Sequence, residues 1–123
     1  MLPGGYPGVD RLLESEGTLD LLREMKAKGK WLAAICAGPR VLDKASALEN
    51  KRYTAYPGQK EKVNSGTHCD KIVVKDGNVI TSRGPATVYA FAYALADALG
   101  GDSLAVKNRM AYFNAFKEGE AHA

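Results

Sequence analysis

The sequence predicts an α/β fold in which helices cover a mostly parallel sheet. Trp31–Ile35 is an apolar run without polar alternation, which is typical of a strand buried on both faces of a parallel sheet. Helical patterns stand before and after this run, and two β-branched runs form a hairpin pattern further along the chain. With 46% hydrophobic and 25% charged residues, residues 1–123 are expected to form one domain.

Two short helices are expected before the apolar strand. Gly8–Glu14 can form the first, and its apolar residues Val9, Leu12 and Leu13 share one face. Thr18 offers the hydroxyl group of an N-cap for the second helix, and Gly29 suits the position just beyond its end. The apolar residues of the second helix are Leu19, Leu22 and Met25.

A turn and a third helix follow the strand. Cys36 ends the strand, and Ala37-Gly38-Pro39 opens the helix, because proline is tolerated in a first helical turn. The side chains expected to face inward are Val41, Leu42 and Ala45. The helix should end before Asn50. Residues 53–66 are expected to be rich in loops, with a turn at Pro57-Gly58.

A β-hairpin is expected next. Ile72–Val74 and Val79–Thr81 are β-branched runs joined by Lys75–Asn78. The Asp76-Gly77 pair in this connection supplies the positive φ angles of a tight turn.

Two helices are expected after the hairpin. The first starts at Gly84-Pro85, runs to Leu99 and ends at Gly100, with Val88, Phe91, Leu95 and Ala98 near one face. The second spans Asp102 to about Phe116 and carries Leu104, Met110 and Phe113. Residues 117–123 are expected to fray.

The charge pattern argues against a nucleic-acid partner. The net charge of +3 comes from scattered Lys and Arg residues, without a basic run or interleaved aromatic residues. No apolar stretch approaches the roughly 20 residues that span a bilayer, and residues 1–5 lack the pattern of a secretion signal. We therefore expect a cytoplasmic protein with no membrane partner. In that compartment Cys36 and Cys69 are expected to be free thiols.

Cys36 stands in the pattern of a nucleophile elbow, a tight turn between a buried strand and a helix. Its neighbours Ala34, Ala37 and Gly38 are small, as the sharp bend requires. The turn would present the sulfur above the strand ends, where ligands of open α/β sheets bind, and the start of the helix favours a thiolate. The alternative is that Cys36 is a small buried residue that simply ends a strand.

Backbone N–H groups near Cys36 are the candidate donors to an oxyanion. The glycines of Pro3-Gly4-Gly5 lack Cβ atoms, so this loop can approach a substrate closely. The alternative for Pro3-Gly4-Gly5 is an ordinary turn. The N–H group of Ala37, the first after the nucleophile, is the second candidate donor.

The remaining chemistry-bearing residues suggest no further site. His68, Cys69 and Asp70 are adjacent and do not have the spacing of metal ligands, so no metal site is expected. His122 lies in the expected tail.

Three separated motifs resemble one protein family. Leu2–Gly5, Ala33–Pro39 and Ile80–Pro85 are similar in residues, order and spacing to the signatures of the ThiJ/PfpI superfamily, in the branch of the Parkinson-disease-associated protein deglycase. The resemblance covers nearly the whole chain. It implies a Rossmann-like or flavodoxin-like αβα sandwich of the class I glutamine amidotransferase-like kind, a homodimer and no cofactor.

The resemblance also assigns roles to individual residues. It implies Cys36 as the nucleophile, with the N–H groups of Gly5 and Ala37 as oxyanion donors. Arg83 would lie near the site, where its turn either touches substrate or shapes the site and the dimer contact. The alternative is a solvated or interface arginine. The branch often carries histidine where this chain has Tyr56. Because tyrosine is a poor base at neutral pH, Tyr56 is either a hydrogen-bonding residue or a packing residue.

The resemblance further implies a segment before the Pro3-Gly4-Gly5 loop. Family members have a strand, a helix and further strands there, and this segment contributes a glutamate that hydrogen-bonds the nucleophilic cysteine. We therefore expect an N-terminal fragment or a companion chain to complete the domain. Without it, Trp31–Ile35 should be partly exposed.

The function implied by the resemblance is enzymatic. A glyoxalase or deglycase would use the Cys36 thiolate to attack the aldehyde of a small dicarbonyl such as methylglyoxal, or to act on its adducts. The alternative is a redox-sensing, chaperone-like protein of oxidative stress with an oxidisable Cys36. Amidase or peptidase activity ranks last, because such branches usually place histidine straight after the nucleophile, where this chain has Ala37.

Overall fold

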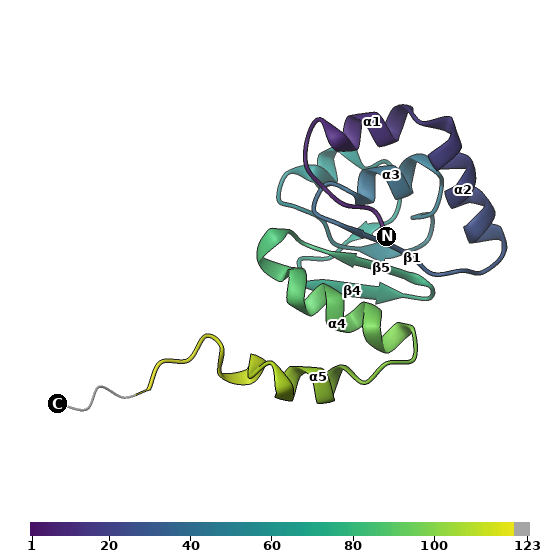
Figure 1. Ribbon diagram of the computed structural model, residues 1–123. Coiled ribbons are helices and arrows are strands. Elements are labelled where there is room, and N and C mark those ends of the chain that lie inside the picture. The colour runs from purple at the N-terminus through teal and green to yellow at the C-terminus, as the bar shows by residue number, and fades with distance from the viewer. Residues whose placement is uncertain (120–123) are drawn as a thin grey trace.

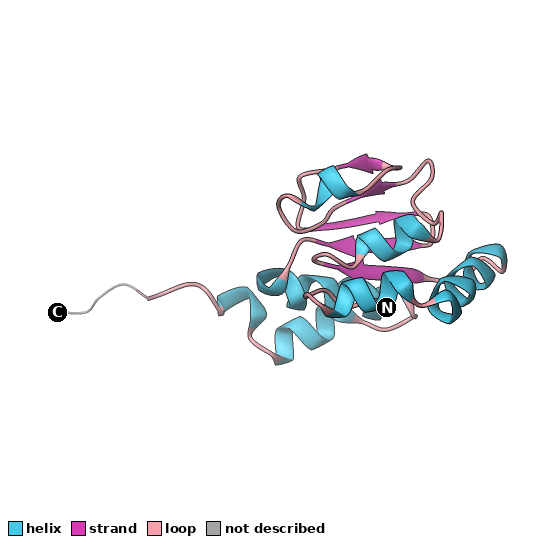
Figure 2. Cartoon of the chain, turned by 90° about the horizontal axis from the view of Figure 1, so that it is seen from above, coloured by secondary structure: helices cyan, strands magenta, loops and turns pink. Residues whose placement is uncertain are grey.

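The computed structural model describes residues 1–119 and has helices on both faces of a central sheet (Figures 1 and 2). The fold is α/β, as the sequence predicts. The helices and strands in chain order are α1 (Gly8–Glu14), α2 (Glu16–Ala27), β1 (Leu32–Ile35), α3 (Pro39–Lys44), β2 (Arg52–Tyr53), β3 (Thr67–His68), β4 (Val73–Asp76), β5 (Val79–Ser82), α4 (Val88–Ala98) and α5 (Ser103–Arg109). Single 3₁₀ turns are η1 (Gln59–Lys62), η2 (Pro85–Thr87) and η3 (Tyr112–Asn114).

The central sheet has three strands in the order β1-β5-β4. β1 runs parallel to β5, and the final pair of their register joins Ile35 to Ser82. Along the free edge of β1, Leu2 forms an isolated parallel bridge to Ala34. The short strands β2 and β3 form a separate parallel pair. The carboxyl ends of β1 and β5 therefore meet at one edge, directly before Cys36.

The predicted hairpin is confirmed as the antiparallel pair β4 and β5. Its turn differs in one detail from the expectation. Asp76 remains paired with Val79 at the end of β4, so Gly77 alone takes a positive φ, of 58°. Glycine is suited to this position because it has no Cβ to clash with the backbone.

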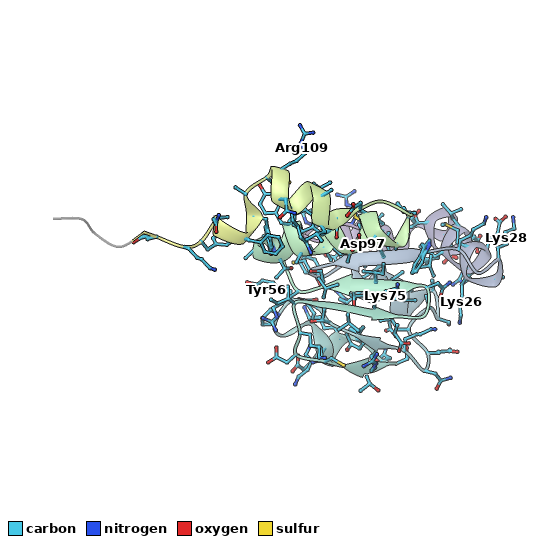
Figure 3. The ribbon with its side chains drawn as sticks, turned by 90° about the horizontal axis from the view of Figure 1, so that it is seen from below. Lys26, Lys28, Tyr56, Lys75, Asp97 and Arg109 are labelled. Carbon is cyan, nitrogen blue, oxygen red and sulfur yellow. The ribbon has the colours of Figure 1, made fainter. Side chains whose placement is uncertain are left out.

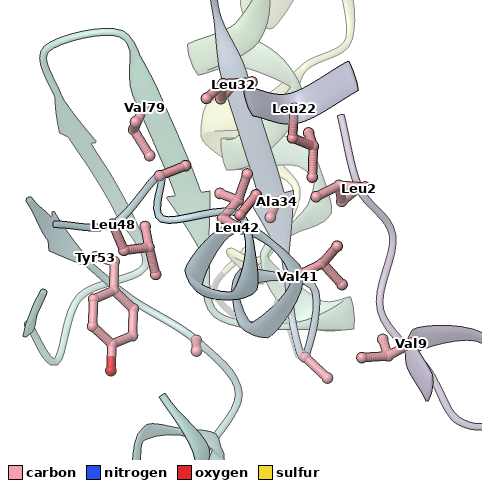
Figure 4. Packing of buried hydrophobic residues seen from close by; sticks show 14 of the residues in the cluster. Leu2, Val9, Leu22, Leu32, Ala34, Val41, Leu42, Leu48, Tyr53 and Val79 are labelled. Atoms are coloured by element: carbon pink, nitrogen blue, oxygen red, sulfur yellow. The ribbon is translucent and has the colours of Figure 1, made fainter. Parts of the chain in front are cut away.

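Two hydrophobic clusters join the helices to the two faces of the sheet. One contains Leu32 and Ala34 of β1 together with buried residues of α1, α2 and α3 (Figure 4). The other contains Ala33, Ile80 and Phe91, the last of which comes from α4. Successive β1 residues thus serve opposite faces, as strand geometry requires. Leu32–Ala34 are buried, so the expected partial exposure of this strand is confined to its half-buried ends, Trp31 and Ile35.

The two N-terminal helices are confirmed, but Thr18 is not the N-cap of α2. Ser15 occupies that position, and its Oγ accepts hydrogen bonds from both the N–H and the hydroxyl of Thr18. Gly29 follows the end of α2 with a φ of 67°, as predicted. Its N–H donates to Lys26 O and that of Lys30 to Met25 O, which is the Schellman arrangement.

The C-terminal region differs from the sequence prediction. The expected helix from Asp102 to Phe116 ends at Arg109, because Ala111 adopts a left-handed conformation with a φ of 54°. Val88, Leu104, Met110 and Phe113 are exposed. Of the residues expected near one face of the helix after the hairpin, Phe91 is buried, and Tyr93 is buried as well. α5 turns back alongside α4, and the chain beyond it extends away from the sheet (Figure 1). The last part of the expected frayed tail lies outside the described residues.

Within residues 1–119, no helix combines the length and the apolar character needed to cross a membrane.

Candidate active site

Cys36 occupies a sharp turn between β1 and α3, as the elbow pattern predicts. Its φ is 65°, in the left-handed region that a side chain with a Cβ rarely adopts. Its N–H donates to Ser82 O at 3.0 Å, and its carbonyl accepts from the N–H of Tyr56 at 2.9 Å. The turn closes with a hydrogen bond from Gly38 N to Ile35 O at 2.9 Å. The thiol is free and half-buried. Hydrogen bonds at both the N–H and the carbonyl of Cys36 therefore hold its backbone in this conformation.

Gly4 lies directly against Cys36. A Cβ atom built on Gly4 would be 2.5 Å from Cys36 Cβ and 3.1 Å from its Sγ, so glycine is needed for this close approach. Gly38 serves the same purpose in the following turn, because a Cβ there would be 2.9 Å from both Ile35 O and Leu2 O. The structure thus brings the Pro3-Gly4-Gly5 loop next to the elbow, although more than 30 residues separate the two in sequence.

The candidate oxyanion donors are the N–H group of Gly5, which follows the glycine in contact with Cys36, and that of Ala37, the residue after Cys36. Within residues 1–119, the N–H groups of Gly5 and Ala37 have no hydrogen-bond partner. Gly5 has a φ of 89°, and its carbonyl accepts from Val9 N at the start of α1. Gly5 is exposed, so water can satisfy its N–H group, whereas Ala37 is buried and an unpaired N–H is uncommon there. A free N–H group next to a nucleophile can bind a substrate oxygen.

Ser82 is a residue of this site that the sequence analysis did not single out. Its side chain is buried, and its Oγ donates to Ile72 O at 2.8 Å and lies 2.6 Å from Thr87 Oγ1. Because its carbonyl also holds the N–H of Cys36, Ser82 links the elbow to the turn after β5. The available signal was its place in the motif Ile80–Pro85, next to Arg83.

Tyr56 contributes its backbone to the elbow and its ring to packing. The ring lies over Gly84, where a Cβ atom would come within 3.1 Å of Tyr56 Cδ2. The side chain is 47% exposed and lies at the opposite end of the sheet from Lys26 and Lys28 (Figure 3). The geometry thus favours the packing alternative for Tyr56.

Arg83 faces an acidic partner. Its Nη2 donates to Asp70 Oδ1 at 2.8 Å in an exposed ion pair, and its N–H donates to Ile72 O. Both side chains line a hollow of about 300 Å³ together with Lys60 and His68. Cys36 is not among the residues that line this hollow. The structure therefore places Arg83 at a hollow that Cys36 does not line, and pairs its guanidinium group with Asp70.

The other titratable residues of the described chain have separate local contacts. His68 packs edge-on against Tyr53, with ring centroids 5.6 Å apart, and Cys69 Sγ contacts Thr67 O at 3.7 Å. Burial, together with the charges of Asp43 and Glu61, raises the pKa of Tyr53. Among residues 1–119, no three His, Cys, Asp or Glu side chains come together as metal ligands. His122 lies outside the described residues.

Comparisons with known proteins identify close relatives. The sequence profile of the DJ-1/PfpI family matches residues 1–98. Protein dj-1beta of Drosophila melanogaster is 48% identical over 103 residues, which are 82% of this chain and 55% of that protein. A deglycase of Pyrococcus horikoshii is 40% identical over 93 residues, which are 74% of this chain and 55% of that protein.

A solved structure agrees with these sequence matches. The crystal structure of Drosophila melanogaster DJ-1beta aligns with a TM-score of 0.82 and 42% sequence identity, over 87% of this chain and 60% of the other. The chain thus spans little more than half the length of these two relatives.

Proposed function

This chain belongs to the DJ-1/PfpI family, and on that basis we propose that it acts as a cysteine-dependent enzyme of the glyoxalase or deglycase type. Its substrates would be small dicarbonyls such as methylglyoxal, or their adducts. The supporting observation is the half-buried thiol of Cys36 on a strained elbow, in contact with the glycine loop and followed directly by the unpaired, buried N–H group of Ala37. The deglycase relative supports carbonyl adducts as the substrate class.

In the proposed reaction, the Cys36 thiolate attacks the aldehyde carbon of methylglyoxal. A C–S bond forms, the carbonyl π electrons move to oxygen, and the alkoxide accepts hydrogen bonds from Gly5 and Ala37. Protonation by water gives a hemithioacetal. The proton on the former aldehyde carbon then moves to the neighbouring carbon through an enediol, and water hydrolyses the resulting thioester to lactate and the free thiol. Water is the only co-reactant, so the reaction balances without a cofactor.

Replacing the nucleophile tests this proposal. In Cys36→Ser, conversion of methylglyoxal to lactate should fall by at least about 10³-fold, because removal of a catalytic nucleophile has effects of this size or larger. Cys69→Ser is the matched control, since Cys69 is the other free, half-buried cysteine, and it should retain the activity. Full conversion by Cys36→Ser would refute the enzymatic proposal.

A redox role for the same thiol is the second candidate. It is supported by the free and partly exposed state of Cys36, because oxidation of a cysteine requires access as well as thiolate character. Peroxide treatment followed by mass spectrometry, alongside the lactate assay, separates the two candidates. Stoichiometric conversion of Cys36 to sulfinate without dicarbonyl turnover would favour the sensor.

We also propose that the functional unit includes residues beyond 1–123 and is a cytoplasmic homodimer. The relatives have almost twice the matched length, and Leu2 pairs with β1 through a single bridge. An N-terminal fragment or companion chain beside Leu2 would extend the sheet, and it would bring the carboxylate that the family resemblance places near Cys36.

A further inference from the structure

Three segments that surround Cys36 meet at one phenol oxygen, that of Tyr6. Arg40 Nη1 donates a hydrogen bond to Tyr6 Oη at 2.6 Å, and Tyr6 Oη donates to Gln59 Oε1 at 2.8 Å. Tyr6 directly follows Gly4 and Gly5, whereas Arg40 lies on α3, four residues after Cys36. Gln59 begins η1. The hydroxyl group of Tyr6 therefore joins the glycine loop to the elbow helix and to the loop that carries Tyr56.

The ring of Tyr6 is held as well as its hydroxyl. Arg40 Cζ lies 5.8 Å and Lys62 Nζ lies 5.4 Å from the ring centroid, both within the range of cation–π attraction. Gln59 is buried, so its amide oxygen depends on Tyr6 to satisfy its hydrogen-bonding capacity. Tyr6 is consequently anchored by three side chains even though it is 46% exposed.

The same contacts reach Cys36 through the backbone. Gln59 N donates to Tyr56 O at 3.0 Å, and Tyr56 N donates to Cys36 O at 2.9 Å. In the other direction, the covalent path from Tyr6 leads through Gly5 to Gly4, which lies against Cys36. Tyr6 is thus connected to Cys36 by two routes, through Gln59 and Tyr56 on one side and through Gly5 and Gly4 on the other.

This arrangement is not optimised for hydrogen bonding alone. Arg40 Nε is buried and has no hydrogen-bond partner in the structure of residues 1–119, and an unpaired buried donor is unfavourable. The guanidinium group reaches Tyr6 and approaches Asp10 only at 4.0 Å. Tyr6 is therefore the closer polar contact of the Arg40 guanidinium group, ahead of Asp10.

We propose that Tyr6, together with Arg40 and Gln59, is a positioning residue that locks the Gly4-Gly5 loop against Cys36. Two adjacent glycines give this loop wide conformational freedom, and Gly5 adopts a φ of 89° that glycine leaves and re-enters easily. The side-chain lock holds the free N–H of Gly5 toward the position of the substrate oxygen. The catalytic part of this proposal rests on the function proposed above, whereas the lock itself does not.

The lock can be measured without any enzymatic assay, by ¹⁵N relaxation at the amides of Gly4 and Gly5. In Tyr6→Phe, which keeps the ring but removes the hydroxyl, the order parameters should fall from the rigid level of about 0.85 toward the flexible level below about 0.6. Tyr89→Phe is the matched control, because Tyr89 is exposed to a similar degree on α4. Unchanged order parameters at both glycines in Tyr6→Phe would overturn the lock.

Variants of Gln59 distinguish loss of the hydrogen bond to Tyr6 from a general destabilisation of the protein. Gln59→Leu removes the acceptor and should mobilise the glycines as Tyr6→Phe does, and the double variant should add little to either single change. Gln59→Glu retains an acceptor at the same position, so the order parameters of Gly4 and Gly5 should stay at the level of the parent protein. Glycines that stay mobile in a folded Gln59→Glu protein, or additive effects in the double variant, would contradict the lock.

The effect of the lock on catalysis is measured separately, as kcat and KM. With methylglyoxal as substrate, Tyr6→Phe should lower kcat by about 10- to 100-fold, the range expected when a reacting group is misplaced by about 1 Å, with KM changed less than twofold. An unchanged kcat in a Tyr6→Phe protein with mobile glycines would refute the positioning role. Activity that survives Cys36→Ser would refute the proposed function and leave the relaxation result as the measure of the lock.

Discussion

Cys36 has a backbone conformation that it would not adopt by preference. A left-handed φ for a residue with a Cβ is unfavourable by about 1–2 kcal/mol, and the φ of Cys36 is 65°. Its two backbone hydrogen bonds, to Ser82 and Tyr56, hold this conformation from opposite sides. Strained residues of this kind cluster at functional sites, so the strain supports Cys36 as the centre of the site.

Gly4→Ala tests whether the glycine loop fits closely against the nucleophile. The added methyl group would lie 2.5 Å from Cys36 Cβ, so either the loop or the elbow must move. We expect a loss of about 1–3 kcal/mol in the free energy of unfolding, as overpacking usually causes. Urea unfolding measures this, and the rate of Cys36 alkylation by iodoacetamide in a Cys69→Ser background should change as well.

Gly8→Ala is the matched control for Gly4→Ala. A Cβ on Gly8 meets no atom within 4 Å, and Gly8 starts α1, where alanine is the better helix former. This variant should be as stable as the parent or more so, with an unchanged alkylation rate. Equal effects of the two substitutions would show that the contact between Gly4 and Cys36 does not constrain the site.

At the scale of elements, the corner between α4 and α5 is fixed by a few polar groups. Gly101 N donates to Ala96 O at 2.8 Å beyond the end of α4. Asp102 caps α5 through the N–H of Ala105. Asp97 accepts from both the hydroxyl and the N–H of Ser103, at 2.7 and 2.9 Å. These contacts set the direction of α5 although most of its apolar side chains are exposed.

Asp97 should make this corner sensitive to acid. The hydrogen bond from the Ser103 hydroxyl, then that from the Ser103 N–H, and more weakly the charges of Lys107 and Lys75 lower the pKa of Asp97. Because the pKa is lower in the folded state, the stabilisation is complete above the unfolded-state pKa and disappears as the pH falls through the folded-state pKa. Ser103→Ala should raise the pKa of Asp97 and reduce stability at neutral pH but not at strongly acidic pH.

Carboxyl NMR titration of Asp97 and urea unfolding at the two pH values measure these effects. Ser103→Thr is the control, because it keeps the hydroxyl group and should keep the lowered pKa of Asp97. A destabilisation by Ser103→Ala that is equal at neutral and at strongly acidic pH would argue against a role of the Asp97 charge.

At the scale of the whole molecule, the sheet is covered by α1, α2 and α3 on one face and by α4 on the other (Figure 1). Among residues 1–119, the free edge of β1 pairs only through the bridge to Leu2. Met1 and Met25 line a hollow of about 370 Å³ together with Ala33 and Ile80 of the sheet and Leu95 of α4. An apolar hollow together with an incompletely paired edge is consistent with the proposed additional segment.

The intact mass of the protein purified from its natural cell tests this proposal. We expect a mass larger than that of residues 1–123, or a second polypeptide that stays associated with the chain, and one cooperative unfolding transition for the assembly. Recombinant 1–123 is the comparison, and its urea midpoint should be lower. A natural protein that is monodisperse, folds cooperatively and consists of these 123 residues alone would contradict the proposal.

Much of the local structure could be predicted from the sequence because neighbouring residues decide it. Gly29, Gly77 and Pro39 stand where backbone conformation or a missing N–H selects them, and the structure confirms the corresponding helix ends and hairpin. The prediction failed where a helix was extended on apolar content alone, because Ala111 breaks the regular backbone before the apolar pattern ends.

The elbow around Cys36 and its family motif follow from the sequence by itself, since strand, turn and helix preferences act over a few residues. Only the tertiary structure shows that Gly4 lies against Cys36, that Arg83 pairs with Asp70, and that Tyr6 bonds Gln59 across 53 residues. The reason is physical. Local φ and ψ preferences depend on adjacent residues, whereas side-chain contacts exist only after the sheet and its helices bring distant segments together.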